Sequence, residues 1–304
     1  MRALGLDLGG SKLLACVIGD HGAILGRVVR PTGRATGPAE ALRLVAGIAE
    51  EMRAIAGPFE VAGLGFPGLV DFPRGVARSS VMLDGWRDVP LADQLAHELG
   101  VRCVVDNDVN AAAVAELACR QDAPPGSMLF VSVGTGIGGA LVLDDRLWRG
   151  HTGVAGEIGN MTIDRHGPLC WCGRRGCLNT AASGAAMERL DGSEDEVLHQ
   201  AATALGIGLA NALNLLNPAL VVLGGGVSRL GSRWLDAVAS TARAEAFPEA
   251  GECRIEAARA GYEAGAVGAA LLAIEATTTA PPEAPGAAVA RGARTPSEGP
   301  PPVR

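Results

Sequence analysis

The stretch ALGLDLGGSKLLACVI, residues 3–18, sets two apolar runs on either side of the polar turn DLGGSK at residues 7–12. A third apolar run at 24–29 follows a second turn, His21-Gly22. Apolar runs of this length separated by glycine turns are typical of antiparallel strands. Residues 3–29 therefore predict a three-stranded meander whose first turn carries a carboxylate, two glycines and a lysine.

The same pattern returns in the second half of the chain. Residues 128–143, MLFVSVGTGIGGALVL, again place a glycine turn, 134–139, between two apolar runs. The break Pro124-Pro125-Gly126 precedes this second copy. The repetition predicts an internal duplication and an α/β chain of two lobes.

Helices and further strands are expected around these hairpins. Apolar residues recur at three- and four-residue spacing in 38–57 and 198–216, which is the period of one helix face. An alanine-rich helix at 109–119 is expected after a polar turn at 106–108. Other expected elements are strands at 61–65, 101–105 and 220–223 and a helix that begins near Ser228.

Composition restricts the class of function. The chain has 304 residues, 48% of them hydrophobic, and a net charge of −7. With no basic stripe, neither nucleic acid nor an anionic membrane is expected as a partner. The first apolar run stops at Asp7 and no run approaches the ~20 residues of a membrane span, so a cytoplasmic location is expected. Residues 277–304 are rich in Ala, Pro, Thr and Gly, and we expect a disordered tail there.

Three glycine turns follow apolar strands, and each can present backbone N–H groups to an anion. An ordinary tight turn is the alternative for each one alone. Neither the P-loop pattern nor a GxGxxG turn that opens a helix fits them. Together they predict a nucleotide site with the candidate residues Asp7, Gly9, Gly10, Ser11, Lys12, Gly134, Thr135, Gly136, Gly138, Gly225 and Gly226.

Residues 106–110, DNDVN, place two carboxylates and two amides at a strand-to-helix junction. Helix capping is one interpretation, because Asp and Asn are good N-cap residues. The other is a catalytic base beside a substrate anchor, since phosphoryl transfer needs a carboxylate that accepts the proton of the attacking hydroxyl. The two roles can coexist, and Asp108 is the candidate base.

The segment CWCGRRGC gathers three of the seven thiols, Cys170, Cys172 and Cys177, around glycines. Buried free Cys residues have no reason to cluster in this way, so a structural zinc site is predicted. Tetrahedral zinc needs four ligands, and His166 is the candidate for the fourth. A reduced, metal-free loop is the alternative.

Together these segments resemble the ROK family, named for repressors, open reading frames and sugar kinases. The resemblance covers nearly all of residues 3–275. It rests on seven motifs in the family's order: DLGGSK at 7–12, GFPGLVD at 65–71, GW and VPL around Trp86 and Leu91, DNDVNAAA at 106–113, GTGIGG at 134–139, AGEIGN at 155–160 and CWCGRRGCLN at 170–179.

This resemblance implies an actin-like ATPase fold of the hexokinase and ribonuclease H type, with two α/β lobes. It implies ATP and Mg²⁺ in the cleft, transfer to a sugar hydroxyl, commonly the primary one, and a homodimer. A small lobe is expected at 1–120, completed by a C-terminal helix near 262–275. A large lobe is expected at 121–260, with a Cys-rich loop at 160–179.

The resemblance also implies roles for single residues. Asp108 would be the base, Asp7 would lie near the metal, and Gly225 and Gly226 would lie near the nucleoside. The residues expected on the substrate side are Asn107, Glu157, Asn160, Asn179, Met82, Gly68 and Gly153.

Three substrate-side positions depart from the family pattern. Asn160 stands where a His that meets both zinc and sugar is usual, Asn179 where a sugar-binding Glu is usual, and Met82 where an Asn is usual. The base and the phosphate turns are intact, so a changed acceptor is expected rather than lost catalysis. By analogy, the acceptor is expected to be a modified hexose, an amino sugar such as kanosamine, or a C7 cyclitol of antibiotic-type pathways, and not plain glucose.

Two alternatives remain: a catalytically silent sugar sensor and an ordinary glucokinase. A ROK repressor is disfavoured, because only six residues precede Asp7 and a helix-turn-helix needs more.

Overall fold

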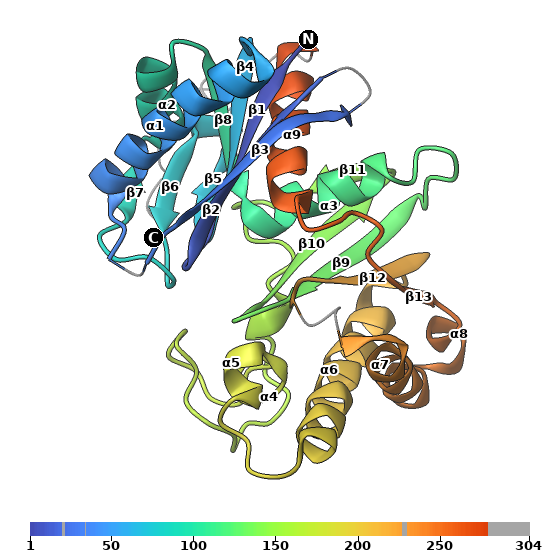
Figure 1. The fold of residues 1–304 in the computed structure, drawn as a ribbon. Helices are drawn as coiled ribbons and strands as arrows, with labels where there is room; N and C mark the ends of the chain where they lie inside the picture. Colours follow the sequence, from blue (N-terminus) through green and yellow to red (C-terminus); the bar gives the residue numbers. More distant parts are fainter. Residues whose placement is uncertain (20–21, 34, 227–229, 279–304) are drawn as a thin grey trace, which may run out of the picture.

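The computed structural model describes residues 1–19, 22–33, 35–226 and 230–278, and it has two α/β lobes (Figure 1). The expected meander is confirmed. The sheet of the first lobe has the strand order β3-β2-β1-β4-β8. Its strands are β1 (Ala3–Leu8), β2 (Lys12–Ile18), β3 (Ile24–Pro31), β4 (Val61–Phe66) and β8 (Arg102–Asn107).

The sheet of the second lobe has the same arrangement, with order β11-β10-β9-β12-β13. In both sheets each adjacent pair among the first three strands in this order is antiparallel. The last two strands run parallel to the central strand, which is β1 in the first sheet and β9 in the second. Even the register agrees, since Asp7 pairs with Gly65 and Ser132 pairs with Gly224. The strands are β9 (Ser127–Val133), β10 (Ile137–Leu143), β11 (Arg146–Trp148), β12 (Leu220–Gly224) and β13 (Arg254–Ala257). The expected duplication is thus present in the backbone.

Helices cover both faces of each sheet, because the central strands carry apolar residues on both faces. In the first lobe, one face of β2 packs under α1 (Pro38–Ala56) and α2 (Leu91–Leu99), and the other under α9 (Ala264–Thr278). In the second lobe, α6 (Glu194–Leu216) and α7 (Ser232–Glu245) cover one face, and α3 (Asp108–Ala118) the other. The two inner helices, α3 and α9, meet between the lobes (Figure 1).

Contact between α3 and α9 is close enough to require glycine. A Cβ added at Gly268 of α9 would lie 1.7 Å from the carbonyl oxygen of Ala111 on α3. Two backbones that approach this closely leave no room to slide, so α3 and α9 form one rigid pair.

Smaller elements complete the lobes. A three-stranded sheet flanks the first lobe, and short helices lie between the longer elements of both. These are β5 (Leu69–Asp71), β6 (Val76–Ser79), β7 (Arg87–Val89), η2 (Phe72–Arg74), η3 (Ile158–Asn160), α4 (Asn179–Ala182), α5 (Gly184–Met187) and α8 (Pro248–Gly251).

Several expected boundaries change. The polar turn at 106–108 is wrong, because β8 continues to Asn107 and α3 begins at Asp108. Helix α6 begins before 198, at a capping box in which Ser193 and Glu196 satisfy each other's backbone N–H groups. Residues 277 and 278, expected in the disordered tail, belong to α9 instead, and the rest of the expected tail, 279–304, lies outside the described residues. The helix expected near Ser228 begins at Ser232, after its N-cap Gly231; residues 227–229 lie outside the described residues.

No helix of the described part of the chain is long and apolar enough to cross a membrane.

Candidate active site

The junction between β8 and α3 brings the polar residues Asp106, Asn107, Asp108 and Asn110 together in one place. Asn107 is the N-cap of α3, and its Oδ1 accepts hydrogen bonds from the backbone N–H groups of Val109 at 2.9 Å and Asn110 at 3.1 Å. Its Nδ2 donates to the carbonyl of Gly68 at 3.2 Å. The amide is thereby fixed at both ends, and its capping role is observed; its role as substrate anchor stays a prediction.

Asp108, the first residue of α3, has an unusual proton affinity. Burial raises the pKa of its carboxyl from 3.8 to about 7, and the nearby charge of Asp7 adds to the rise. Burial likewise raises the pKa of Asp7 to about 6, against the opposing effect of Lys12. A carboxylate with a pKa near the working pH is suited to general base catalysis.

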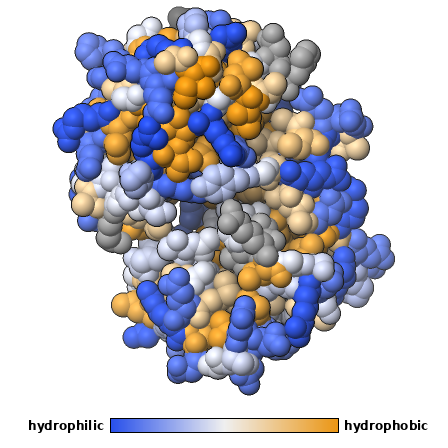
Figure 2. Space-filling view, viewed as in Figure 1, coloured by the Kyte–Doolittle hydropathy of each residue, from blue (hydrophilic) through white to orange (hydrophobic). Residues whose placement is uncertain are grey.

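A cavity of about 690 Å³ opens beside this carboxylate, between the lobes. Figure 2 shows a recess where the two lobes meet. Both sheets and both inner helices contribute to its lining, which includes Asp7, Lys12, Asp108, Ser132, 224–226 and 258–262. The cavity therefore joins the predicted base to two of the three predicted glycine turns.

Each of the first two glycine turns is closed by an internal backbone hydrogen bond, which spans three residues in the first turn and two in the second. Gly9 donates its N–H to the carbonyl of Lys12, and Gly134 donates to that of Gly136, both at 2.8 Å. At the third turn Gly225 has φ +87°, and a Cβ there would lie 2.4 Å from the carbonyl oxygen of Val133. Only glycine fits this position.

Lys12 has a partner that the sequence did not suggest. Its ammonium nitrogen lies 3.6 Å from the ring centroid of Tyr262, on the segment that leads into α9. Such cation–π contacts restrain a long side chain, so Lys12 is held at the wall of the cavity.

Three polar side chains on the expected substrate side form one hydrogen-bonded chain. Asn160 donates its Nδ2 to Oε2 of Glu157 at 2.7 Å, and Asn179 donates its Nδ2 to Oδ1 of Asn160 at 3.2 Å. Asn179, which is buried, accepts the backbone N–H of Ile137 at 2.7 Å. The two asparagines thus bind each other and connect Glu157 to the end of the second glycine turn. Burial raises the pKa of the Glu157 carboxyl.

The remaining substrate-side candidates lie against backbone. A Cβ added at Gly10 would lie 3.2 Å from Cε of Met82, so Met82 packs against the first glycine turn. A Cβ at Gly68 would lie 2.1 Å from the carbonyl oxygen of Ser79. At Gly153 it would lie 2.8 Å from that of Val70, with φ +82°. Both glycines permit close approach of chain segments; contact with a substrate stays a prediction for both.

The three cysteines lie together. The Sγ atoms of Cys170, Cys172 and Cys177 are all within 4.8 Å of one another. Burial opposes the thiolate of Cys172, but hydrogen bonds from Arg174 and the neighbouring thiols lower its pKa to about 7. Three thiolates fit the donor set of tetrahedral zinc and leave one position. His166 is exposed and is not part of the cluster that the described residues form, so it is not brought in as the fourth ligand.

A buried ion pair behind the base was missed by sequence reasoning. Asp106 accepts hydrogen bonds from Nε of Arg149 at 2.8 Å and from Nδ2 of Asn110 at 2.9 Å. Arg149, which follows β11 of the second lobe, also stacks 3.6 Å from the ring of Phe72 in the first. No spacing rule connects these residues, and only the fold brings them together.

Comparison with known proteins decides the family. The model of the ROK family matches residues 3–276. The chain belongs to the ROK family. An N-acetylmannosamine kinase of Yersinia pseudotuberculosis is 32% identical, over 90% of this chain and 98% of its own. A glucokinase of Thermotoga maritima is 29% identical, over 76% of this chain and 84% of its own.

Solved ROK structures share the fold. The ROK hexokinase of Thermus thermophilus has 36% identity and a TM-score of 0.78, covering 91% of this chain and 99% of its own. A ROK glucokinase of Streptomyces griseus, solved with glucose and AMPPNP, has 29% identity and a TM-score of 0.78, covering 90% of this chain and 100% of its own. The expected actin-like ATPase fold is confirmed.

Proposed function

We propose that this ROK protein is an ATP-dependent kinase that phosphorylates a hydroxyl, the primary one, of a hexose-like acceptor. The observation that carries the proposal is the carboxylate of Asp108, whose pKa is raised to about 7 at the edge of a cavity lined by glycine turns. A carboxylate of this kind accepts the proton of the attacking hydroxyl. ROK relatives that are named glucokinase and N-acetylmannosamine kinase support the reaction class.

The residues that line the cavity have separate proposed roles in binding the nucleotide. Backbone N–H groups of the glycine turns would hold the phosphates, with Lys12 supplying a positive charge held by Tyr262. Asp7 offers the hard oxygen ligand that Mg²⁺ prefers, and the ion would neutralise phosphate charge there. Gly225 and Gly226 line the same cavity and would lie near the nucleoside.

We infer that the acceptor differs from plain glucose. Asn160 and Asn179 use their amides on each other, on Glu157 and on Ile137. This end of the site therefore presents one carboxylate and neutral amides, where the family pattern has a second carboxylate and an imidazole. A modified hexose, an amino sugar of the kanosamine kind or a C7 cyclitol fits this change; glucose is the alternative acceptor.

We also propose a structural zinc on Cys170, Cys172 and Cys177, with the fourth ligand from outside the cluster. We further propose a division into lobes at 1–120 and 121–260, a homodimer and a cytoplasmic location.

Phosphorylation of a substrate panel tests the proposal. Wild type and Asp108→Asn are incubated with Mg-ATP and hexoses, amino sugars and cyclitols, and phosphorylated product is followed by mass spectrometry. We expect wild type to act on at least one modified acceptor better than on glucose, and the variant on none. Turnover of no acceptor, or equal turnover by the variant, would refute the kinase and leave a silent sugar sensor.

The double variant Asn160→His with Asn179→Glu tests the acceptor inference separately. It should move the ratio of kcat/KM values toward glucose. A ratio that does not move would show that these two positions do not set the acceptor.

A further inference from the structure

Two chain segments join the lobes, and the second forms part of the cavity wall. The first is α3 with the residues that follow it, 108–126, between β8 of the first lobe and β9 of the second. The second, 258–263, connects β13 of the second lobe to α9 on the first. Its residues 258–262 line the cavity that holds Asp108. The position of this second segment, called here the rear crossover, therefore sets one wall of the proposed nucleotide site.

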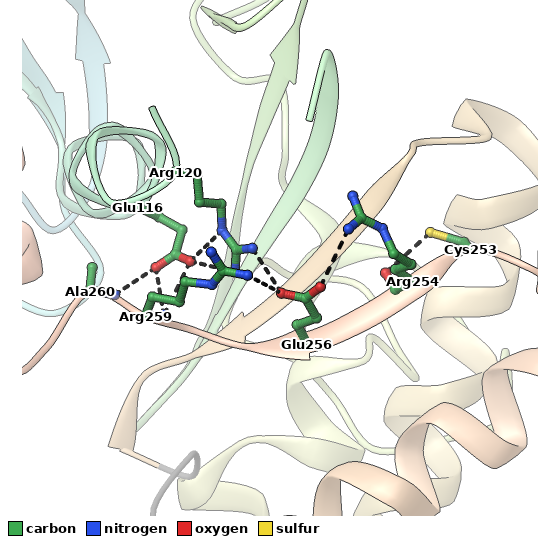
Figure 3. Close-up of polar contacts among 7 residues, drawn as sticks. All are labelled: Glu116, Arg120, Cys253, Arg254, Glu256, Arg259 and Ala260. Atoms are coloured by element: carbon green, nitrogen blue, oxygen red, sulfur yellow. Dashed lines mark hydrogen bonds and ion pairs between the residues drawn. The ribbon is translucent and has the colours of Figure 1, made fainter. Parts of the chain in front are cut away.

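A buried carboxylate holds the backbone of the rear crossover. Glu116, near the end of α3, is 0% exposed. Its Oε2 accepts the backbone N–H of Arg259 at 2.9 Å and that of Ala260 at 2.8 Å (Figure 3). Hydrogen bonds to a charged acceptor are about twice as strong as neutral ones, and a pair on adjacent amides fixes both position and direction.

The negative charge of Glu116 is balanced within the protein. Arg120, one turn further along, donates Nε to Oε1 of Glu116 at 2.7 Å. The same guanidinium donates Nη1 to Oε2 of Glu256 on β13 at 2.8 Å (Figure 3). Removing a charge from water costs several kcal/mol unless it is paired in this way. The carboxylate of Glu116 is thus paired with Arg120 in the interior, where it also accepts hydrogen bonds from two backbone amides.

Helix α3 carries this carboxylate and the proposed base on one rigid element. Asp108 is its first residue, and Glu116 lies eight residues later, about 12 Å along the axis. The close contact of Gly268 with Ala111 fixes α3 against α9, into which the rear crossover leads. Helix α3 therefore positions Asp108 directly and the rear crossover through Glu116, and the crossover leads into α9, which packs on α3. The relative positions of Asp108 and the cavity wall are thereby fixed.

We propose that Glu116 is a positioning residue for the nucleotide: it holds the rear crossover at a fixed place relative to Asp108. Among the described residues, no hydrogen bond joins Glu116 or Arg120 to the acceptor-side chain of Glu157, Asn160 and Asn179, which ends at Ile137. The two hydrogen bonds from the crossover amides to Glu116 are called here the clamp. Loss of the clamp should therefore weaken nucleotide binding and leave acceptor binding unchanged. What the cavity binds rests on the proposed function; the clamp itself does not.

The variant Glu116→Gln keeps the shape and removes the charge. Its control is Glu256→Gln, which removes the charge that pairs with the side chains of Arg120, Arg254 and Arg259 but leaves the two backbone hydrogen bonds from the crossover to Glu116. Dissociation constants are measured by calorimetry for Mg-AMPPNP and for the acceptor. We expect Glu116→Gln to weaken Mg-AMPPNP binding by about tenfold, as for loss of one charged hydrogen bond. Acceptor binding should stay within about twofold, and the control should resemble wild type.

Hydrogen exchange measures directly whether the two crossover amides are hydrogen-bonded. The amides of Arg259 and Ala260 should exchange faster in Glu116→Gln and at the wild-type rate in the control. If Glu116→Gln does not fold, Glu116→Asp keeps the charge beside Arg120 but withdraws the oxygens from the amides, and the same results are expected.

Unchanged Mg-AMPPNP binding with faster exchange would overturn the positioning role while leaving the kinase in place. Equal weakening of both ligands, or equal effects of the two variants, would overturn it as well and indicate general loss of structure. A wild type that binds no Mg-AMPPNP would refute the proposed function itself, and with it the positioning of a nucleotide.

Discussion

Replacing Asp108 by Asn should inactivate the protein and stabilise it at the same time. In the folded chain this carboxyl has a pKa raised from 3.8 to about 7, so it holds a proton that the unfolded chain releases. Between about pH 4 and pH 7 the folded state therefore binds more protons, and the free energy of unfolding falls as the pH rises through this window. The contribution is absent below pH 4 and is at its most unfavourable above pH 7.

The size of this effect follows from the two pKa values. One pKa unit corresponds to about 1.4 kcal/mol, so the rise from 3.8 to about 7 gives a ceiling of about 4 kcal/mol. The side chain at position 108 is partly exposed and can relax, which lowers the actual difference below this ceiling. We expect the free energy of unfolding of Asp108→Asn to exceed that of wild type by about 1–3 kcal/mol at pH 8 and to equal it at pH 4.

Urea unfolding at pH 4, 6 and 8 without nucleotide measures that difference, and kinase assays measure the loss of activity. A general base is worth about 10²–10⁴-fold in rate, and kcat/KM of the wild type should rise with pH as Asp108 loses its proton near pH 7. A stability difference that is the same at pH 4 and pH 8 would refute the assignment of the raised pKa. Activity of the variant within tenfold of wild type would refute the role as base.

Gly268→Ala should lower the free energy of unfolding by about 1–3 kcal/mol, because the added Cβ forces the two inner helices apart. Gly47→Ala, on an open face of α1, should not lower it. The urea midpoints of the two variants measure the difference. Arg149→Met should cost about 3 kcal/mol because it leaves Asp106 buried without its partner, and an unchanged melting temperature would contradict this. A zinc chelator should lower the melting temperature of wild type but not of Cys172→Ser, and metal analysis should find about one zinc per wild-type chain; metal-free wild type would exclude the zinc.

Local features of the sequence were sufficient for much of the fold. The hairpins were predictable because glycine turns interrupt apolar runs within a few residues, and α1 because its apolar face repeats with the helical period. The turn at 106–108 was predicted wrongly because Asp and Asn favour turns locally. Pairing of Asp106 with Gly65 and of Asn107 with Phe66 extends the strand instead.

Long-range contacts lay beyond that kind of reasoning. Glu116 and the amide of Arg259 are 143 positions apart, and Asp106 and Arg149 are 43 apart. Nothing in either segment marks the other as its partner. Nearness in sequence is also a poor guide to a metal ligand, since His166 lies close to Cys170 along the chain, yet it is exposed and outside the cysteine cluster.

The duplicated sheets place different side chains at one pair of equivalent positions in the cavity lining, and that difference makes the two sides of the cleft unequal. Asp7 and Ser132 occupy equivalent places in their hairpins, each paired with a glycine of the parallel neighbour, and both line the cavity. One half therefore offers a carboxylate where the other offers a hydroxyl. Two identical halves would accept a phosphate chain equally well from either end. With Asp7 on one side only, the Mg²⁺ that we propose there would favour one orientation of the nucleotide, in which the metal-bearing end of the phosphate chain lies toward the first lobe.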